Sequence, residues 1–242
     1  MTYEMYDIHM HLIPYVDDGA ANMEMAKSML KTAREQGVRG IVATPHSSAF
    51  FGNEEQVDWN YTLLREHIMR SGEEIALGIG CEVYLDRRNL ALALVSLREG
   101  LIPTMNGTQY VLSEFSPWES VESAMLSVEA LVSAGYLPII AHAERYYLLQ
   151  EQDAIGKFRE MGCLVQCNVY SVFEEKDSHI RAWANRMLAR REVDFLGSDA
   201  HRTGHRPPRV ETGLRYLYEN YDSAYIDGIA LENPRKLLRM GE

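Results

Sequence analysis

Short apolar runs that end in histidine or acidic residues recur along almost the whole chain, and this pattern constrains the fold more than any other feature. The runs are rich in Ile, Val, Leu or Tyr and are short enough to be buried strands. In a barrel of parallel strands all the strand ends lie on one face, where enzymes of that architecture build their sites. Residues distant in sequence would then meet at one place. The endings are Asp7 to His11, Asp17-Asp18, Thr44 to His46, Cys81-Glu82, Ser113-Glu114, His142 to Arg145, and Ser198 to His201.

A cluster of so many imidazoles and carboxylates is electrostatically costly unless cations lie among them. An isolated buried carboxylate needs a cation or several hydrogen-bond donors. The simplest partner for the whole cluster is more than one divalent metal ion. The sequence therefore predicts a multinuclear metal site at the ends of the strands.

Strands and helices alternate about seven times, which favours parallel βα units. Expected strands are Tyr6–His9, Gly40–Thr44, Ile75–Glu82, Gln109–Glu114, Leu137–His142, Cys163–Asn168 and Val193–Gly197. Expected helices are Ala20–Gln36, Val57–Ser71, Asn89–Arg98, Ser120–Ala134, Ala154–Met161, Glu174–Arg190, Val210–Glu219 and Asn233–Leu238. Periodicity alone does not separate an open sheet from a closed barrel, but ligand-type residues at nearly every strand end favour a barrel. We expect an α/β fold, a distorted (β/α)7 TIM-like barrel, as a single domain over residues 1–242.

Composition indicates which classes of binding partner and which cellular compartment are expected. The chain of 242 residues carries a net charge of -11, which disfavours nonspecific binding to nucleic acid or to anionic membranes. Its cysteines, Cys81, Cys163 and Cys167, form no metal or redox motif and are expected to be buried free thiols. Neither a basic leader with an apolar core nor a membrane-length apolar stretch is present, so we expect a cytoplasmic protein without membrane insertion.

Spacing separates candidate ligands from ordinary polar residues. His9 and His11 are two apart on an extended segment, so both imidazoles can face one ion. Asp199 and His201 repeat that spacing at another strand end. The pair Asp17-Asp18 precedes a helix, where an aspartate can act as an N-cap. We assign the capping role to the first aspartate and the ligand role to Asp18.

Three basic residues are candidates for binding an anionic substrate. Arg145 lies next to the predicted cluster, and its planar guanidinium matches phosphate or carboxylate. The alternative for Arg145 is a salt bridge to Glu144 or Glu114. His205 and Arg206 lie in a proline-rich loop that either covers the site or is a plain solvent loop. Tyr146 and Tyr147 next to Arg145, and Tyr170 after Asn168, are candidates for an aromatic rim around a ring-bearing substrate.

The ordered blocks Asp-Ile-His-x-His, Val-Asp-Asp-Gly-Ala, Ala-Thr-Pro-His, Cys-Glu-Val-Tyr, Leu-Ser-Glu-Phe, Ala-His-Ala-Glu-Arg-Tyr, Gln-Cys-Asn and Gly-Ser-Asp-Ala-His resemble the polymerase and histidinol phosphatase superfamily. The likeness spans nearly the whole chain and is closest to the bacterial protein-tyrosine-phosphatase branch linked to capsular and extracellular polysaccharide synthesis. The resemblance implies a trinuclear site, with Arg145 binding phosphate and with Asp199 and His201 in the catalytic centre. The implied metal ligands are His9, His11, Asp18, His46, Glu82, Glu114, His142, Asp199 and His201. Met10 departs from the small residue expected at that position, but it should point away from the metals.

The resemblance also implies the substrate and the chemistry. Family substrates are phosphotyrosines, notably in the tyrosine-rich tail of a bacterial tyrosine kinase. The mixed imidazole and carboxylate set suits Mn²⁺ best, with Fe or Zn as alternatives. We expect a metal-activated hydroxide as nucleophile. Alternatives are a phosphatase of small esters such as histidinol phosphate, and a phospho-partner binder without turnover. A nuclease is disfavoured by the acidic charge.

Overall fold

The computed structural model describes residues 3–72, 74–150, 154–173 and 176–240, and its strands are all parallel. They are β1 (Met5–Met10), β2 (Val38–Ala43), β3 (Ala76–Ile79), β4 (Glu82–Tyr84), β5 (Tyr110–Glu114), β6 (Leu137–Ile140), β7 (Leu164–Asn168) and β8 (Phe195–Gly197). Except for the third, each expected strand is confirmed to within two residues at either end. The predicted α/β class with parallel βα units is confirmed.

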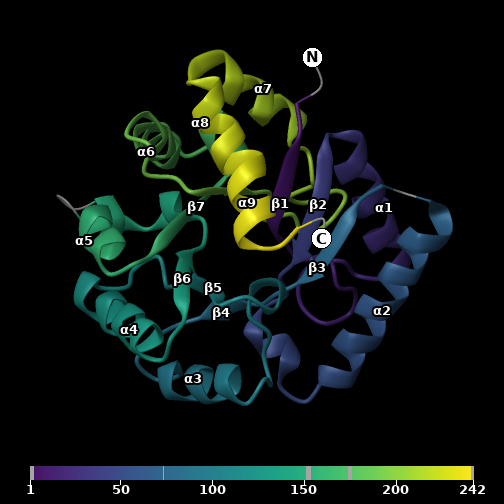
Figure 1. The fold of residues 1–242 in the computed structure, drawn as a ribbon, viewed down its shortest axis with the longest axis horizontal. Helices are drawn as coiled ribbons and strands as arrows, with labels where there is room; N and C mark the ends of the chain where they lie inside the picture. Colours follow the sequence, from purple (N-terminus) through teal and green to yellow (C-terminus); the bar gives the residue numbers. More distant parts are fainter. Residues whose placement is uncertain (1–2, 73, 151–153, 174–175, 241–242) are drawn as a thin grey trace.

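Helices follow the strands in turn and surround them (Figure 1). They are α1 (Met23–Glu35), α2 (Glu54–Ser71), α3 (Leu90–Arg98), α4 (Val121–Ser133), α5 (Ala154–Glu160), α6 (Ser178–Ala189), α7 (Glu211–Asn220), α8 (Ser223–Asp227) and α9 (Asn233–Leu237). Each expected helix is present, but the predicted start of α6 at residues 174–175 lies outside the described residues. Sequence analysis missed α8 and the π-helical segment Gly228–Glu232 that joins it to α9.

The strands form two sheets whose edges meet. One sheet has the order β1-β2-β3 and the other the order β4-β5-β6-β7-β8. A parallel bridge between Met10 and Ala200 joins β1 to the segment after β8, and another joins His46 to Glu82. The bond from Asp199 N to His9 O (2.8 Å) strengthens the first junction. The strands therefore follow one another around a distorted ring, which is the architecture expected from the polar strand ends.

The predicted strand Ile75–Glu82 is wrong as one strand, because the chain divides into β3 and β4 at Gly80-Cys81. β3 pairs with β2, whereas β4 pairs with β5. A Cβ atom on Gly80 would lie 2.8 Å from the Sδ atom of Met105, so only glycine fits this bend without displacing its neighbour. The division sends Glu82 to the start of a new strand, where it faces the inside of the ring.

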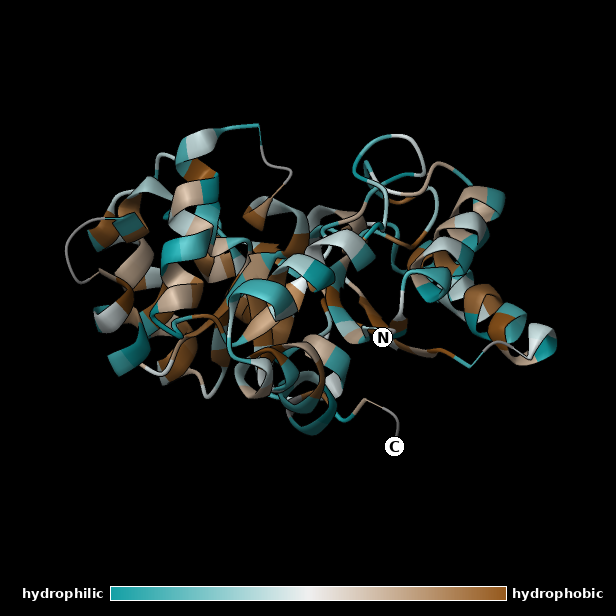
Figure 2. Ribbon diagram, turned by 90° about the horizontal axis from the view of Figure 1, so that it is seen from above, coloured by the Kyte–Doolittle hydropathy of each residue, from teal (hydrophilic) through white to brown (hydrophobic). Residues whose placement is uncertain are grey.

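Two apolar cores hold the ring together. The larger lies between the strands and the helices, and Figure 2 shows brown segments inside the molecule among helices in which teal and brown residues are mixed. The smaller core lines the ring and includes Ile8, Leu112 and Phe195. Leu238 and Met240, just beyond α9, belong to this inner core and are 0% and 2% exposed. The C-terminal segment therefore fills the inside of the ring, and the polar site occupies the ends of the strands.

Candidate metal centre

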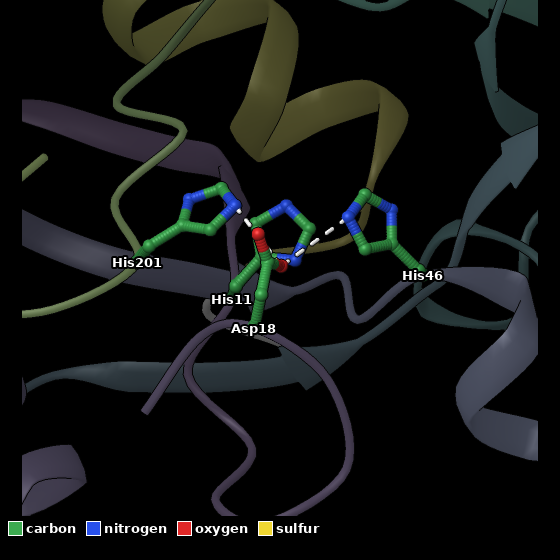
Figure 3. Close-up of side chains that lie close together, drawn as sticks. All are labelled: His11, Asp18, His46 and His201. Carbon is green, nitrogen blue, oxygen red and sulfur yellow. Dashed lines mark ion pairs between the residues drawn. The ribbon is translucent and has the colours of Figure 1, made fainter. Parts of the chain in front are cut away.

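The outermost part of the site is a group of three imidazoles around one carboxylate (Figure 3). Asp18 Oδ1 lies 3.4 Å from His46 Nε2 and 3.4 Å from His201 Nε2. His11 lies between these rings, with its centroid 4.6 Å from that of His46 and 4.0 Å from that of His201. Their nitrogen and oxygen atoms all lie within 4.8 Å of one another, so one cation can contact all four residues.

Glu82 lies at the centre of the site, and it is only 1% exposed. Its Oε1 atom is 2.9 Å from His142 Nε2 and 3.2 Å from His9 Nε2. Its Oε2 atom is 3.1 Å from His46 Nδ1 and 3.2 Å from His11 Nε2. A single carboxylate thus faces four imidazoles, two from the end of β1, one from the end of β6 and one from the loop after β2.

Two further carboxylates complete the arrangement. Asp199 Oδ1 is 3.6 Å from the Nε2 atoms of both His9 and His11. Glu114 is 3.8 Å from His46 Nδ1 through one oxygen and 3.8 Å from His142 Nε2 through the other. All nine residues that the resemblance implied as ligands are therefore brought into one cluster.

Several buried ring nitrogens make no hydrogen bond with any described residue, which is the mark of a cation site. These atoms are the Nε2 atoms of His9, His11 and His201 and the Nδ1 atom of His142. A buried polar atom without a partner costs about 1–3 kcal/mol, so native proteins rarely retain several in one place. The Nε2 atoms of His9 and His11 face carboxylate oxygens at 3.2 to 3.6 Å without bonding geometry, and His201 Nε2 lies 3.4 Å from Asp18 Oδ1. Imidazole nitrogens and carboxylate oxygens together suit first-row divalent ions.

The pKa values of the clustered imidazoles and carboxylates also show that positive charge stabilises this site. Burial alone would lower the pKa of His9, but the carboxylates of Glu82 and Asp199 outweigh it and raise that pKa. Burial would raise the pKa of Glu82 and of Asp199, but the imidazoles around them, His9 first, hold both well below their usual range. Burial and a neighbouring imidazole lower the pKa of His201 to about 4. Protons on imidazoles thus balance the carboxylates where cations would otherwise lie.

Arg145 lies directly beside this cluster. Its Nη1 atom is 2.9 Å from Asp199 Oδ2, and its Nη2 donates to the hydroxyl of Tyr170. Burial would lower the pKa of Arg145, but Asp199 and Tyr170 raise it, so the guanidinium stays charged. The salt bridge to Glu144 or Glu114 that we considered is not the pairing found, because the partner is Asp199.

The other two candidate basic residues differ in placement. Arg206 Nη1 lies 3.1 Å from Asp199 Oδ2, so this side chain reaches the same carboxylate oxygen as Arg145. His205 is exposed, and its backbone carbonyl accepts a hydrogen bond from Arg202 N (3.0 Å). The loop therefore brings Arg206 to the cluster and turns His205 to solvent.

Two cluster residues have unusual backbone conformations. His142 has φ 32° and Asp199 has φ 51°, in the left-handed region that non-glycine residues seldom adopt. Asp199 and His201 share the i, i+2 spacing of His9 and His11, but β8 ends at Gly197 as predicted and Asp199 is not extended. Asp199 and His201 are nonetheless close, with His201 Nδ1 3.5 Å from Asp199 Oδ1. Strained conformations of this kind persist where surrounding contacts over-determine them, often at functional sites.

The capping role that we assigned to Asp17 is also wrong. The N-cap of α1 is Asn22, whose side chain accepts from Met25 N. Asp17 Oδ2 instead lies 2.8 Å from His11 Nδ1, and it accepts from His46 N (3.2 Å). Asp17 therefore orients the His11 ring with Nε2 toward the cluster, as carboxylates behind metal-binding imidazoles do.

Sequence analysis missed the side chains that support the cluster from behind. Gln166 is fully buried, and its Oε1 atom accepts from His142 N (2.7 Å) and lies 3.1 Å from His9 Nδ1. Its Nε2 atom donates to Asn168 Oδ1 (2.9 Å), and Asn168 Nδ2 lies 3.4 Å from Asp199 Oδ2. Alternate polar residues at the end of the apolar strand β7 were the available signal.

Other expectations concern the rest of the chain. Cys81, Cys163 and Cys167 are free and buried, as expected. Among the described residues, no helix combines the length and apolar character needed to cross a membrane.

Comparisons with known proteins agree with this geometry. The chain is 32% identical to the tyrosine-protein phosphatase CpsB of Streptococcus pneumoniae, covering 97% of this chain and 98% of the relative. It is 30% identical to the tyrosine-protein phosphatase YwqE of Bacillus subtilis, covering 97% and 92%. A solved structure from the work on these two metal-dependent tyrosine phosphatases matches with a TM-score of 0.77 and 25% identity, covering 97% of this chain and 94% of that one. The family model for capsular polysaccharide synthesis proteins CpsB/CapC matches residues 5–239, and the chain therefore belongs to the CpsB/CapC family.

Proposed function

We propose that the chain is a metal-dependent protein-tyrosine phosphatase, a phosphoric monoester hydrolase that acts on phosphotyrosine in a protein. The observation that carries the proposal is the buried cluster of imidazoles and carboxylates with unpartnered ring nitrogens and Arg145 at its edge. Relatives named as tyrosine phosphatases cover almost the full length of both chains, which supports the same reaction here.

The proposed metal ligands are the nine clustered residues, and three ions are the proposed number. Three overlapping groups of donors support that number: His11 with Asp18, His46 and His201; His9 with His11 and Asp199; and His46 with Glu82 and Glu114. Mn²⁺ is the proposed ion, with Fe and Zn as the alternatives, because imidazole and carboxylate donors without thiolate suit these ions. When bound, such ions supply Lewis acidity, which lowers the pKa of a coordinated water and neutralises phosphate oxygens.

The residues of the chain have distinct roles in this proposal. Glu82 is placed to contact more than one ion, because its two oxygens face different pairs of imidazoles. Arg145 stays protonated and binds the phosphate, stabilising the charge that develops on its oxygens in the transition state. Arg206 adds a second positive charge at Asp199 and also contacts substrate, while His205 has the weaker case because it faces solvent.

The finer assignments are proposals as well. The substrate is proposed to be the tail of a bacterial tyrosine kinase that regulates capsular or extracellular polysaccharide synthesis, in keeping with the matched family. The free buried cysteines are compatible with a cytoplasmic location. Residues 1–242 are proposed to act as one domain.

Phosphate release from a phosphotyrosyl peptide tests the function. We expect turnover with Mn²⁺ that is abolished by a chelator, and a lower kcat/KM on histidinol phosphate. Arg145→Ala should lower kcat by about 10²- to 10³-fold while leaving metal content unchanged. Arg70→Ala, which removes an 80% exposed arginine from α2, is the matched control.

His201→Ala should behave differently and lower metal content and activity together. Preference for histidinol phosphate would favour the small-ester alternative. Tight peptide binding without turnover in metal-replete protein would favour the non-catalytic alternative. Full activity in the presence of chelator would contradict the metal-dependent chemistry.

A further inference from the structure

A pair of exposed aromatic rings lies at the rim of the proposed active site. Trp118 is 80% exposed and Tyr147 is 45% exposed. Their ring centroids are 5.1 Å apart and their planes differ by 20°, so the two rings are stacked. Tryptophan side chains are usually largely buried. Single exposed apolar residues are common, but a patch of adjacent exposed apolar residues often marks a binding surface.

The pair lies on two neighbouring loops that both carry residues of the site. Trp118 follows Glu114 by four residues in the loop between β5 and α4, and Tyr147 follows Arg145 by two residues in the loop after β6. Each ring therefore lies on a segment that begins at a residue of the proposed site, Glu114 for one and Arg145 for the other.

Buried contacts beneath the pair fix its position. Tyr146 is 1% exposed, and its hydroxyl accepts a hydrogen bond from Phe115 N (3.1 Å), which ties one loop to the other. The Tyr146 ring lies 5.5 Å from the His142 ring and 5.9 Å from the Phe115 ring. The backbone N–H of Trp118 donates to Ser116 Oγ (3.3 Å) in its own turn. These contacts join the two loops that carry the exposed rings to each other and to His142 of the cluster.

A third exposed ring adjoins the pair. The Tyr147 ring lies 6.1 Å from the exposed ring of His179 on α6, so Trp118, Tyr147 and His179 form a row. A polypeptide has residues on both sides of a phosphotyrosine that can contact this row, whereas a small phosphate ester has no flanking segment.

We propose that Trp118 and Tyr147 form a docking surface for the polypeptide segment of the substrate that flanks the phosphotyrosine. This inference rests on the proposed phosphatase function and adds to it the side chains that select a polypeptide. Aromatic rings stack on other rings without a requirement for charge, so flanking tyrosines suit this surface best.

A second copy of this chain is the less suitable occupant. A stable protein–protein interface buries about 800 Å² on each partner, whereas one aromatic side chain buries about 150–250 Å². The exposed pair is too small for such an interface but suffices for a few flanking residues of a peptide.

The test compares Trp118→Ala with wild-type protein, both loaded with Mn²⁺, on two substrates. One is phenyl phosphate, and the other is a phosphotyrosyl peptide with tyrosines on both sides. We expect Trp118→Ala to lower kcat/KM on the peptide by about tenfold, mainly through KM, and to leave phenyl phosphate hydrolysis and metal content unchanged. Trp59→Ala is the matched control, because Trp59 is 62% exposed on α2 and should have no effect on either substrate.

Binding of the unphosphorylated peptide by fluorescence polarisation gives a second readout that does not need turnover. Equal affinity of wild-type protein and Trp118→Ala for this peptide would overturn the docking surface. An equal loss of activity on both substrates would show that Trp118 only supports the loop, which also overturns it. A wild-type dimer that Trp118→Ala dissociates would assign the surface to a second copy. Absence of hydrolysis of both substrates by wild-type protein would instead refute the phosphatase function.

Discussion

Replacing Gln166 with leucine tests whether the cluster is oriented from behind. The change keeps similar volume in a fully buried position but removes both polar atoms of the amide. Gln166 Oε1 accepts from His142 N (2.7 Å) and lies 3.1 Å from His9 Nδ1. For His9 to offer Nε2 to a cation, its proton must be on Nδ1 and must point to this oxygen.

The expected magnitude follows from these contacts. Leucine leaves two buried N–H groups without an acceptor, those of His142 N and His9 Nδ1. Each unpartnered buried group costs about 1–3 kcal/mol, so the free energy of unfolding should fall by about 2–6 kcal/mol. Loss of a group that orients a metal-binding imidazole typically weakens metal affinity by about 10- to 100-fold, or about 1.4–2.7 kcal/mol.

Two assays on the same protein separate stability from metal binding. Urea unfolding in the presence of chelator measures stability, and titration of metal-free protein with Mn²⁺ against a chromophoric chelator measures affinity. Gln56→Leu is the control, since Gln56 is exposed on α2 and its side chain donates to Asn60 Oδ1 (3.0 Å), which is not a residue of the cluster. A Gln166→Leu protein that loses stability but binds Mn²⁺ as tightly as wild type would refute the orienting role.

Three further predictions use other parts of the structure. Gly197→Ala should weaken Mn²⁺ binding by about tenfold in the same titration, because the new Cβ would lie 2.8 Å from both Gln166 Nε2 and His9 Cβ. Metal-free protein should lose stability in urea titrations as pH rises above the ordinary histidine pKa of 6.5: the folded-state pKa of His9 is raised, so its contribution is complete below that pH and disappears as pH passes the folded pKa. Metal-replete protein should lack this loss, and a pH-independent metal-free protein would contradict the reasoning. Asp194→Ala should lower the free energy of unfolding by about 2–3 kcal/mol without changing metal content, because Asp194 pairs with Arg159 through both oxygens and accepts from a backbone N–H of β7.

The parallel α/β fold and the membership of the cluster were predictable because their signals are local. Apolar runs of strand length alternate with helical periodicity, and parallel strands place their ends on one face whatever the details of packing. Polar residues at those ends, such as Glu82 and His142, were therefore expected to meet. The resemblance supplied the ligand set, and spacing supplied the pairing of His9 with His11.

The wrong predictions for Asp17 and for the third strand have a common cause. Contacts between side chains on opposite parts of the ring cannot be recognised from the sequence of either segment. Asp17 precedes a helix and fits a cap, yet its carboxylate bonds to His11 and to the backbone of His46. The third strand divides at Gly80-Cys81, where a Cβ on Gly80 would meet Met105 from another segment. No periodicity within either segment records these neighbours.

The sequence by itself determined which imidazole and carboxylate side chains stand at the strand ends and in which order they follow one another along the chain. Only the tertiary structure decided how that chemistry is oriented: Gln166 sets the imidazole of His9, and Asp199 enters the cluster from a left-handed conformation. It also decided that Trp118 and Tyr147 stack at the rim of the site. The physical reason is that residue type and local periodicity are properties of short segments, whereas an orientation depends on contacts between strands that are distant in sequence and adjacent only after the ring closes.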